Sequence, residues 1–424
     1  MNKIKVILIG AGNRGTTYAR HAFDACPELE IVAVADPNPV RRNHIKEKFG
    51  LPESACFEGW KDILALDKFA DAAIIATQDQ MHFEPAMKAI ELGYHLLLEK
   101  PAAPTPEECY KIADAANKKG VSVIICHVLR FTPFFTTLKR IIDEGKIGKV
   151  MNINHYEGVG HIHYSHSFTR GNWHKEADSS PMLLAKSCHD IDILQWLVGE
   201  KCTRVHSFGT LSHFCAENKP EGAPEFCYMG CPVAESCPYN AEKIYACERS
   251  HYISRAADSE SPTQDDVRRV LTETNYGRCV YQCDNDVVDH QVVNLEYESG
   301  ATVSFTMSAF NQGGRRIHIM GTKGEVYATM KDKTITLYEF ETGKKTEVPI
   351  LDAITNQEIT GGHGGGDRGI MRALSEYLCG TYKGNALTDI STSVANHLTV
   401  FAAEQARREG RVVTVDEYIE GLKN

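Results

Sequence analysis

The first third of the chain alternates short apolar runs with segments of helical periodicity. The apolar runs have the length of strands and lie at residues 3–9, 30–35, 72–76, 95–98 and 121–126. Between them, Phe83–Leu92 and Pro106–Lys119 carry apolar residues at helical spacing, and Thr105 is placed to cap the second helix. Strands that alternate with helices run parallel, because a crossover is needed to connect them. Residues 1–128 are therefore predicted to form a doubly wound parallel α/β sheet.

From about residue 149 the pattern changes to longer segments in which apolar and polar residues alternate. The clearest of them are residues 292–305, 316–320 and 334–340, joined by glycine-containing turns such as 298–300. Alternation of this kind predicts strands with one buried face. We expect residues 129–424 to form an α+β domain with a large, mostly antiparallel, open sheet, closed by helices at about 368–378 and 392–409.

Composition and charge exclude several classes of protein. The 424 residues include 46 Lys and Arg against 56 Asp and Glu, a net charge of −10, which argues against nucleic acid as a partner. Hydrophobic residues make up 42% of the chain and charged residues 24%, so most of it is expected to fold. No apolar run approaches the roughly 18 residues of a membrane span, and residues 1–10 resemble a strand more than a signal peptide. The expectation is a cytoplasmic protein without a membrane partner.

A glycine motif indicates a dinucleotide site where the first strand meets the first helix. The motif is G-x-G-x-x-G, a spacing that lets bare backbone approach a pyrophosphate at a helix N-terminus. Asp36 ends the second strand, 21 residues after Gly15, where an adenosine ribose presents its hydroxyls. A tight turn with a turn-forming aspartate is the structural alternative. Asp36 would repel a 2′-phosphate and favours NAD, while Arg41 and Arg42 leave NADP open. The cofactor-binding candidates are Gly10, Gly12, Asn13, Arg14, Gly15 and Asp36.

Two further blocks complete a pattern that resembles the Gfo/Idh/MocA oxidoreductase family. One runs from Ile75 to His82, the other contains Glu99-Lys100-Pro101, and the likeness continues through 145–150 and 321–324. The resemblance implies an N-terminal Rossmann domain that binds a nicotinamide cofactor, with Thr77, Gln78, His82 and Glu99 as further cofactor-binding candidates. It also implies a sugar or glycoside as the small-molecule substrate, and a homo-oligomer, dimer or tetramer, assembled through the C-terminal sheet.

The resemblance assigns a catalytic role to Lys100. In this family the lysine of the Glu-Lys-Pro motif contacts both the nicotinamide ribose and a substrate hydroxyl. An ammonium beside a reacting alcohol stabilises the developing alkoxide, which agrees with that role. A solvated surface lysine is the alternative, but a position at a strand end above a cofactor favours function.

The second family motif is an Asp, three residues and then a His that acts as general acid and base. Here His189 takes the histidine position, but Ala185 replaces the aspartate. A histidine titrates near neutrality and can accept a hydroxyl proton unaided. Lys186 is either a third catalytic residue that stabilises an oxyanion or a lysine that caps a helix. Asp190 is a substrate-site candidate, and the alternatives are that it orients His189, faces the cofactor side or caps the helix. Asp192 is expected to support the fold.

Histidine and aromatic residues gather in the segment that precedes this motif. Tyr164, Phe168 and Trp173 stand among five histidines within twenty residues and suggest a wall on which a sugar stacks. A polar loop rich in hydrogen-bonding side chains is the alternative. The remaining substrate-binding candidates are His127, Arg130, Tyr156, His161, Trp173 and His174.

A cysteine-rich insertion spans about residues 202–283 and holds eight of the 14 cysteines. Four thiolates within 21 residues would suit a structural zinc ion, and an iron–sulfur cluster is also conceivable. Their spacing matches neither class closely, so buried thiols acting as small hydrophobic residues are an equal alternative. The candidate metal ligands are Cys227, Cys231, Cys237 and Cys247, and His213 and Cys215 are further candidates.

Three functions are compatible with these residues. The first is an NAD-dependent dehydrogenase acting on a sugar, polyol or glycoside, in which His189 removes a hydroxyl proton and Lys100 stabilises the alkoxide. The second is an NAD-dependent glycosidase that oxidises its sugar transiently and shows no net redox change, which the loss of the aspartate at Ala185 leaves open. The third is a non-catalytic protein that senses NAD or a sugar, although the presence of Lys100 and His189 argues against it.

Overall fold

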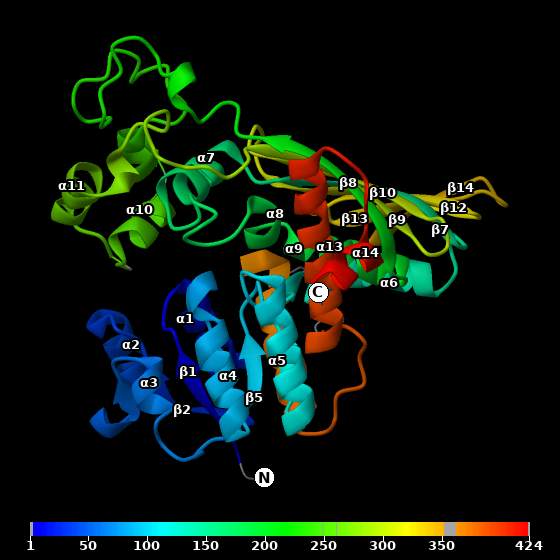
Figure 1. The fold of residues 1–424 in the computed structure, drawn as a ribbon, viewed down its shortest axis with the longest axis horizontal. Coiled ribbons are helices and arrows are strands. Elements are labelled where there is room, and N and C mark those ends of the chain that lie inside the picture. Colours follow the sequence, from blue (N-terminus) through cyan, green and yellow to red (C-terminus); the bar gives the residue numbers. More distant parts are fainter. Residues whose placement is uncertain (1–2, 249, 260, 352–361, 423–424) are drawn as a thin grey trace.

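The computed structural model describes residues 3–248, 250–259, 261–351 and 362–422, and these form two sheets with helices around them (Figure 1). None of the helices in those ranges is both long and apolar enough to cross a membrane.

The first sheet has six parallel strands, as predicted for a Rossmann fold. Their order is β3-β2-β1-β4-β5-β6. The strands are β1 (Ile4–Ile9), β2 (Leu29–Ala35), β3 (Cys56–Phe57), β4 (Ala72–Ile75), β5 (His95–Leu98) and β6 (Val123–Ile125). The central strands are almost completely buried on both faces, which explains their continuous apolar sequence. The two-residue β3 was not predicted, because it is too short to show a period.

Helices connect these strands, and α2 and α5 begin at residues whose side chains cap them. Thr105 accepts a hydrogen bond from the Glu108 N–H, and Asn38 accepts one from the Val40 N–H. The helices of this half are α1 (Asn13–Ala25), α2 (Pro39–Phe49), α3 (Trp60–Ile63), α4 (Phe83–Leu92) and α5 (Pro106–Lys119). The boundaries of α4 and α5 agree with the sequence prediction.

One helix from the end of the chain completes the first domain. Helix α12 (Gly366–Leu378) packs against α1 and the turn at Val128–Phe131. Its residues Ile370, Met371 and Leu374 share a buried cluster with the strand residues of the first sheet. Helix α12 therefore adds to the cover that α1 and α2 give one face of the first sheet, although it lies far beyond residue 128 in the sequence.

The second sheet has nine strands and is mostly antiparallel, as predicted. Their order is β14-β13-β12-β11-β7-β10-β9-β8-β15, and among the strands of the described residues only β7 and β10 pair in parallel. The strands are β7 (Val150–Gly158), β8 (Cys202–Thr210), β9 (His290–Tyr297), β10 (Thr302–Ser308), β11 (Gly314–Gly321), β12 (Gly324–Thr329), β13 (Thr334–Glu339), β14 (Lys344–Pro349) and β15 (Val413–Thr414). The predicted segment 292–305 spans most of β9, a turn and the first part of β10.

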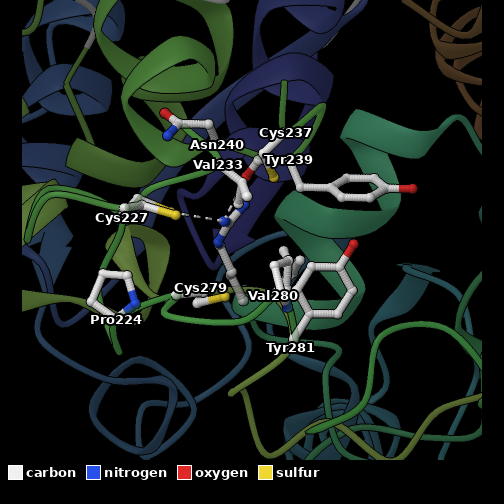
Figure 2. A pocket seen from close by; sticks show the side chains of 13 residues that line it. Pro224, Cys227, Val233, Cys237, Tyr239, Asn240, Cys279, Val280 and Tyr281 are labelled. Atoms are coloured by element: carbon white, nitrogen blue, oxygen red, sulfur yellow. Dashed lines mark hydrogen bonds between the residues drawn. The ribbon is translucent and has the colours of Figure 1, made fainter. Parts of the chain in front are cut away.

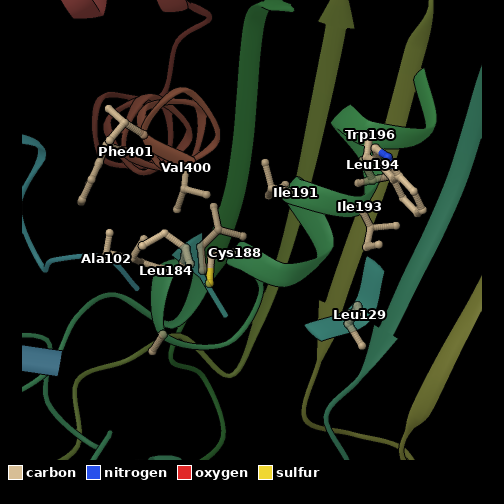
Figure 3. Close-up of a cluster of buried hydrophobic side chains, with 14 of the residues drawn as sticks. Ala102, Leu129, Leu184, Cys188, Ile191, Ile193, Leu194, Trp196, Val400 and Phe401 are labelled. Carbon is tan, nitrogen blue, oxygen red and sulfur yellow. The ribbon is translucent and has the colours of Figure 1, made fainter. Parts of the chain in front are cut away.

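Two helices cover the buried face of this sheet. Helix α13 (Ile390–Glu409) packs against β8, α9 (Cys188–Val198) and α5, so it contacts both halves of the molecule. Figure 3 shows Ile191 and Leu194 of α9 and Val400 and Phe401 of α13 among the buried apolar side chains. The other helices of this half are α6 (Pro133–Asp143), α7 (His161–Tyr164), α8 (Met182–Ala185) and α14 (Val415–Gly421).

The insertion forms a separate lobe at one end of the second sheet (Figure 1). It contains α10 (Ser250–Ala257) and α11 (Gln264–Glu273). A small apolar cluster that includes Ile244, Ile253 and Val270 holds these helices together. The insertion therefore has an apolar core of its own.

Candidate active site

The glycine motif forms a turn that only glycine permits at two positions. Gly10 has a φ of +88°, and a Cβ there would lie 2.5 Å from the Ala76 carbonyl oxygen. A Cβ on Gly15 would overlap the Gly10 carbonyl oxygen. At Gly12 the nearest atom to such a Cβ is Nη1 of Arg41, at 3.6 Å, so the approach to the N-terminus of α1 is open. This cradle suits the pyrophosphate of a dinucleotide.

The carboxylate of Asp36 is held against this turn. It is 3% exposed and accepts hydrogen bonds from the Ala11 N–H at 2.6 Å and the Asn38 N–H at 2.8 Å. Arg42 donates to the Asp36 carbonyl oxygen at 2.6 Å. Asp36 thus lies at the tip of β2 beside the glycine turn, the position expected for binding a ribose.

Arg14 and Glu99 meet in a network below the cofactor cradle. Arg14 donates to Glu99 at 2.7 Å and to Asp367 of α12 at 2.6 Å. Burial raises the pKa of Glu99, but the charges of Arg14 and Lys100 outweigh it and hold that pKa below its usual range. Glu99 also accepts the Lys100 N–H at 2.8 Å, so the network fixes the backbone from which the Lys100 side chain extends.

The motif between Thr77 and His82 lies against the Glu-Lys-Pro turn. Gln78 precedes a short 3₁₀ turn, and the Thr77 hydroxyl donates to the Met81 carbonyl oxygen at 2.9 Å. His82 is 1% exposed, with its Nδ1 2.6 Å from the Pro101 carbonyl oxygen and its Nε2 3.2 Å from that of Thr77. His82 therefore joins the two loops that are predicted to face the cofactor.

Lys100 connects the two halves of the predicted active site. Its Nζ donates to the Ala185 carbonyl oxygen at 2.7 Å, at the position where the family motif has an aspartate. Ala185 ends α8, and His189 lies in the first turn of α9. The backbone of residue 185 thus accepts the lysine although the family's side-chain carboxylate is absent. An ammonium has three N–H donors, and this is its one hydrogen bond to the described part of the chain.

Three buried histidines, His127, His189 and His397, lie close together in this part of the site. The ring of His127 lies 6.0 Å from that of His189 and 5.8 Å from that of His397, between centroids. Burial, helped by the nearby Lys100 charge, lowers the pKa of His127 and lowers that of His397 to about 3. His397 accepts the Ala102 N–H at 3.1 Å through Nε2, and its Nδ1 lies 2.7 Å from the Ser393 carbonyl oxygen, which fits a neutral ring. Neutral rings at His127 and His397 avoid repulsion between like charges near Lys100.

Lys186, whose side chain is 23% exposed, joins a group of buried charges that extends to the second sheet. Its Nζ lies 3.5 Å from Glu157, and burial lowers its pKa. Arg315 lies 3.0 Å from Glu157 and 2.7 Å from Asp190, and His155 lies 2.7 Å from Asp190. Burial raises the pKa of Asp190, but Arg315 and His155 hold it well below its usual range. Asp190 is fully buried and engaged by these partners, so the structure does not direct it at His189 or at a substrate.

Arg130 forms a second buried ion pair. Its Nε and Nη2 each lie 2.7 Å from the carboxylate of Asp192, and Asn396 donates to the same carboxylate at 2.5 Å. Both members of the pair are less than 5% exposed. Asp192 thus supports the fold, as expected, and it holds Arg130 away from solvent.

Of the outer candidates, Trp173 lies closest to the cofactor loops. Its indole Nε1 donates to Asp79, next to Gln78, at 3.3 Å. Nδ1 of His174 lies 2.7 Å from the Gly171 carbonyl oxygen, and its Nε2 lies 3.4 Å from the Asp284 carboxylate. Nδ1 of His161 lies 3.1 Å from the Asn311 carbonyl oxygen. Neither histidine contacts Lys100 or the motif around His189.

Tyr156 lies on the opposite face of β7 from Glu157. Successive side chains of a strand point to opposite faces, and Tyr156 packs under Arg316, whose Cζ is 4.5 Å from the ring centroid. The structure therefore does not bring Tyr156 to the site.

The suggested aromatic wall is largely interior packing. Tyr164 is fully buried and Phe168 is 3% exposed. They stack on each other at 5.7 Å, and Tyr164 stacks on Phe214 at 5.0 Å. These rings have no free face for a sugar, which leaves Trp173 as the partly exposed aromatic residue of the group.

The cysteines of the insertion surround a small cavity. Figure 2 shows Cys227, Cys237 and Cys279 around it, with Tyr239 and Tyr281 beside them, and Cys231 also lines it. An isolated bridge between Phe226 and Arg278 brings the two segments together. Burial raises the pKa of the Cys237 and Cys279 thiols, which favours their protonated form.

The described residues give no support to a preformed zinc site. Within them, no three His, Cys, Asp or Glu side chains are close enough to hold a metal ion. The buried guanidinium of Arg170 extends into the cavity, 3.9 Å from the Cys227 sulfur, and donates to the Tyr239 carbonyl oxygen at 2.8 Å. The side chain of Cys247 lies outside the described residues. The arrangement agrees with the alternative of small buried thiols.

Sequence reasoning missed Glu157, Arg315 and His397. Glu157 and Arg315 occupy polar positions on strands whose pairing brings together distant segments, and His397 lies inside a long helix. The alternation of buried positions along β7, with histidine and glutamate among them, is the one signal that points to a polar interior.

Comparison with known proteins agrees with this site. The description "Oxidoreductase family, NAD-binding Rossmann fold" matches residues 4–127, and "Oxidoreductase family, C-terminal alpha/beta domain" matches residues 139–415. The chain belongs to the Gfo/Idh/MocA family of oxidoreductases. Within that class, it is an oxidoreductase with an NAD-binding domain.

Individual relatives share moderate identity. YteT of Bacillus subtilis is 26% identical over 368 residues, which cover 81% of this chain and 82% of that protein. The scyllo-inositol 2-dehydrogenase (NAD(+)) of the same organism is 28% identical over 214 residues, 50% of this chain and 58% of that protein. A levoglucosan dehydrogenase solved with NADH and L-sorbose has the same fold, with a TM-score of 0.73 at 18% identity over 98% of this chain and 99% of that one.

The neutral state of His397 makes stability depend on pH. The unfolded chain binds a proton at this histidine near pH 6.5, whereas the folded chain does so near pH 3, so stability falls as the pH drops below 6.5. At pH 5 this histidine is expected to cost the wild type about 2 kcal/mol relative to pH 7. Urea unfolding gives the free energy of unfolding at pH 7 and at pH 5. The difference between these two values should be smaller in His397→Gln than in the wild type, by about that amount. Equal differences in the two proteins would contradict the assignment.

Proposed function

We propose that this protein is an NAD-dependent dehydrogenase that oxidises a secondary hydroxyl of a sugar or cyclic polyol. The observation that carries the proposal is the hydrogen bond from Lys100 to the Ala185 carbonyl oxygen, because it joins the Glu-Lys-Pro turn to the motif that carries His189. The glycine cradle and Asp36 fit a dinucleotide on the same edge of the first sheet.

Lys100 and His189 divide the chemistry at the hydroxyl. When bound, NAD supplies the hydride acceptor. The Lys100 ammonium has donors left for a substrate hydroxyl and stabilises negative charge on its oxygen. His189 is 7% exposed, and its imidazole is the proton acceptor. Glu99 and the Arg14 network fix the position of Lys100.

The proposed substrate class rests on the donors of the site and on the relatives. Lys100, His189 and the rim residue Trp173 suit a polyhydroxylated ring, since they combine hydrogen-bonding groups with one aromatic face. Relatives named inositol 2-dehydrogenases match about half of this chain. A transient oxidation without net redox change is the competing reaction, and the test below separates the two.

The test is a substrate screen of the purified full-length protein. Inositols, hexoses and aryl glycosides are supplied with NAD, and NADH and free aglycone are followed separately. We expect at least one polyol or sugar to yield NADH in proportion to the oxidised product. Release of aglycone without accumulation of NADH would overturn the proposal in favour of a glycosidase, and binding of NAD without turnover of any compound would favour a sensor.

We also infer that the outer face of the second sheet is the oligomer surface. This face carries exposed aromatic side chains at Phe208, Tyr327 and Tyr338, which are 64%, 50% and 38% exposed. Tyr327 and Tyr338 lie on neighbouring strands. A second copy of the chain that covers this face would remove their apolar surface from water.

A further inference from the structure

The insertion reaches the first domain through Asp258, which follows α10. Asp258 has a φ of 55°, a left-handed conformation that aspartate tolerates better than most residues. The helix ends there, with Asp258 N–H donating to the Arg255 carbonyl oxygen and Ser259 N–H to that of Ser254, at 3.4 and 3.0 Å. This end of the helix places a carboxylate of the insertion beside the loop between β2 and α2.

The Asp258 carboxylate binds Asn38 of that loop and Arg41 of the first turn of α2. Nε of Arg41 lies 2.8 Å from both of its oxygens, and Nδ2 of Asn38 donates to one of them at 2.6 Å. The pair is partly exposed, at 37% for the Arg41 side chain and 36% for that of Asp258. Asn38 also caps α2, so Asp258 contacts the structure that positions Arg41.

This loop is where a dinucleotide-binding domain distinguishes a ribose 2′-hydroxyl from a 2′-phosphate. An arginine next to the aspartate of β2 is the group that would attract the phosphate. Arg41 borders the glycine turn, since its Nη1 lies 3.6 Å from the position of a Cβ on Gly12. Arg42, the other candidate, donates instead to the Asp36 carbonyl oxygen.

We propose that Asp258 reinforces the cofactor specificity that Asp36 gives the site: by neutralising Arg41, it removes a cation that would bind a 2′-phosphate and adds to the preference for NAD over NADP. The insertion thus acts on the cofactor site through charge. The proposal rests on NAD binding by this family and does not depend on the identity of the substrate.

The test measures the affinities of the full-length protein for NADH and NADPH by fluorescence titration at low salt. Asp258→Asn removes the charge, keeps the size of the side chain and retains a residue type that tolerates a positive φ. We expect NADPH to bind about tenfold more tightly to this variant, because the freed guanidinium gains a charge-assisted bond to the phosphate, with NADH affinity nearly unchanged.

Two further variants make the result specific. Asp265→Asn removes an exposed carboxylate of the same insertion, paired with Arg268 on α11, and should change neither affinity. Adding Arg41→Gln to Asp258→Asn should abolish the gain in NADPH affinity. An unchanged ratio of NADPH affinity to NADH affinity in Asp258→Asn would overturn the proposal. A gain in NADPH affinity that persists in the double variant without Arg41 would also overturn it. These affinities are measured without substrate, so a failed substrate screen leaves the result interpretable.

Discussion

Replacing Lys100 with methionine is expected to lower kcat/KM by about 10³-fold on the best substrate of the screen, the effect of removing one preorganised donor from a developing oxyanion. Methionine keeps most of the length of the side chain and loses the ammonium. The bond to the Ala185 carbonyl oxygen disappears with it, but Glu99 still holds the backbone of residue 100. NADH affinity, measured by fluorescence titration, should therefore change little.

Lys118→Met is the matched control for this variant. Lys118 lies on α5 of the same domain, 76% exposed and paired only with Asp114 one helical turn away. Its loss should leave both turnover and NADH affinity unchanged, since exposed pairs of this kind contribute little. Turnover by Lys100→Met within threefold of the wild type would remove Lys100 from the mechanism.

Replacing Asp192 with alanine is expected to lower the free energy of unfolding by about 3–5 kcal/mol, because it leaves the guanidinium of Arg130 buried without a counter-ion. Both side chains are almost fully buried, and Asn396 would lose its acceptor as well. Urea unfolding followed by circular dichroism at pH 7 measures the change.

The double variant Arg130→Met with Asp192→Leu separates the cost of a lone charge from that of lost packing. Apolar residues of similar volume often replace a buried pair with little loss. We expect the double variant to be more stable than Asp192→Ala, although Asn396 still lacks its acceptor. A double variant as unstable as the single one would show that packing around Trp196, over whose ring Arg130 lies at 5.5 Å, dominates instead.

The first sheet was predictable because its signals are local. The strands other than β3 are short apolar runs, α5 has a threonine cap, and the spacing of Gly10, Gly12 and Gly15 follows directly from the geometry of one turn. Lys100 and His189 were identified through a family motif, and the structure brings their two segments together.

The polar interior of the second domain could not be predicted because its partners are distant in sequence. His155 and Glu157 interrupt the apolar pattern of β7, and Arg315 reaches them only after β11 has paired with that strand. The same limit explains the wrong expectation for Tyr156. Which face of β7 is buried follows from the pairing with distant strands, and Tyr156 lies on the face opposite to His155 and Glu157, under Arg316.

The contribution of α12 to the first sheet also has a bearing on synthesis. The six strands are complete once residue 125 has been translated, but α12, which completes the cover that α1 and α2 give one of their faces, begins at residue 366. During translation, part of that apolar face therefore stays uncovered until about 240 further residues have been added. We expect a chaperone to bind this exposed surface in the nascent chain. A truncated protein that lacks the last sixty residues, and with them α12, should aggregate through the same surface.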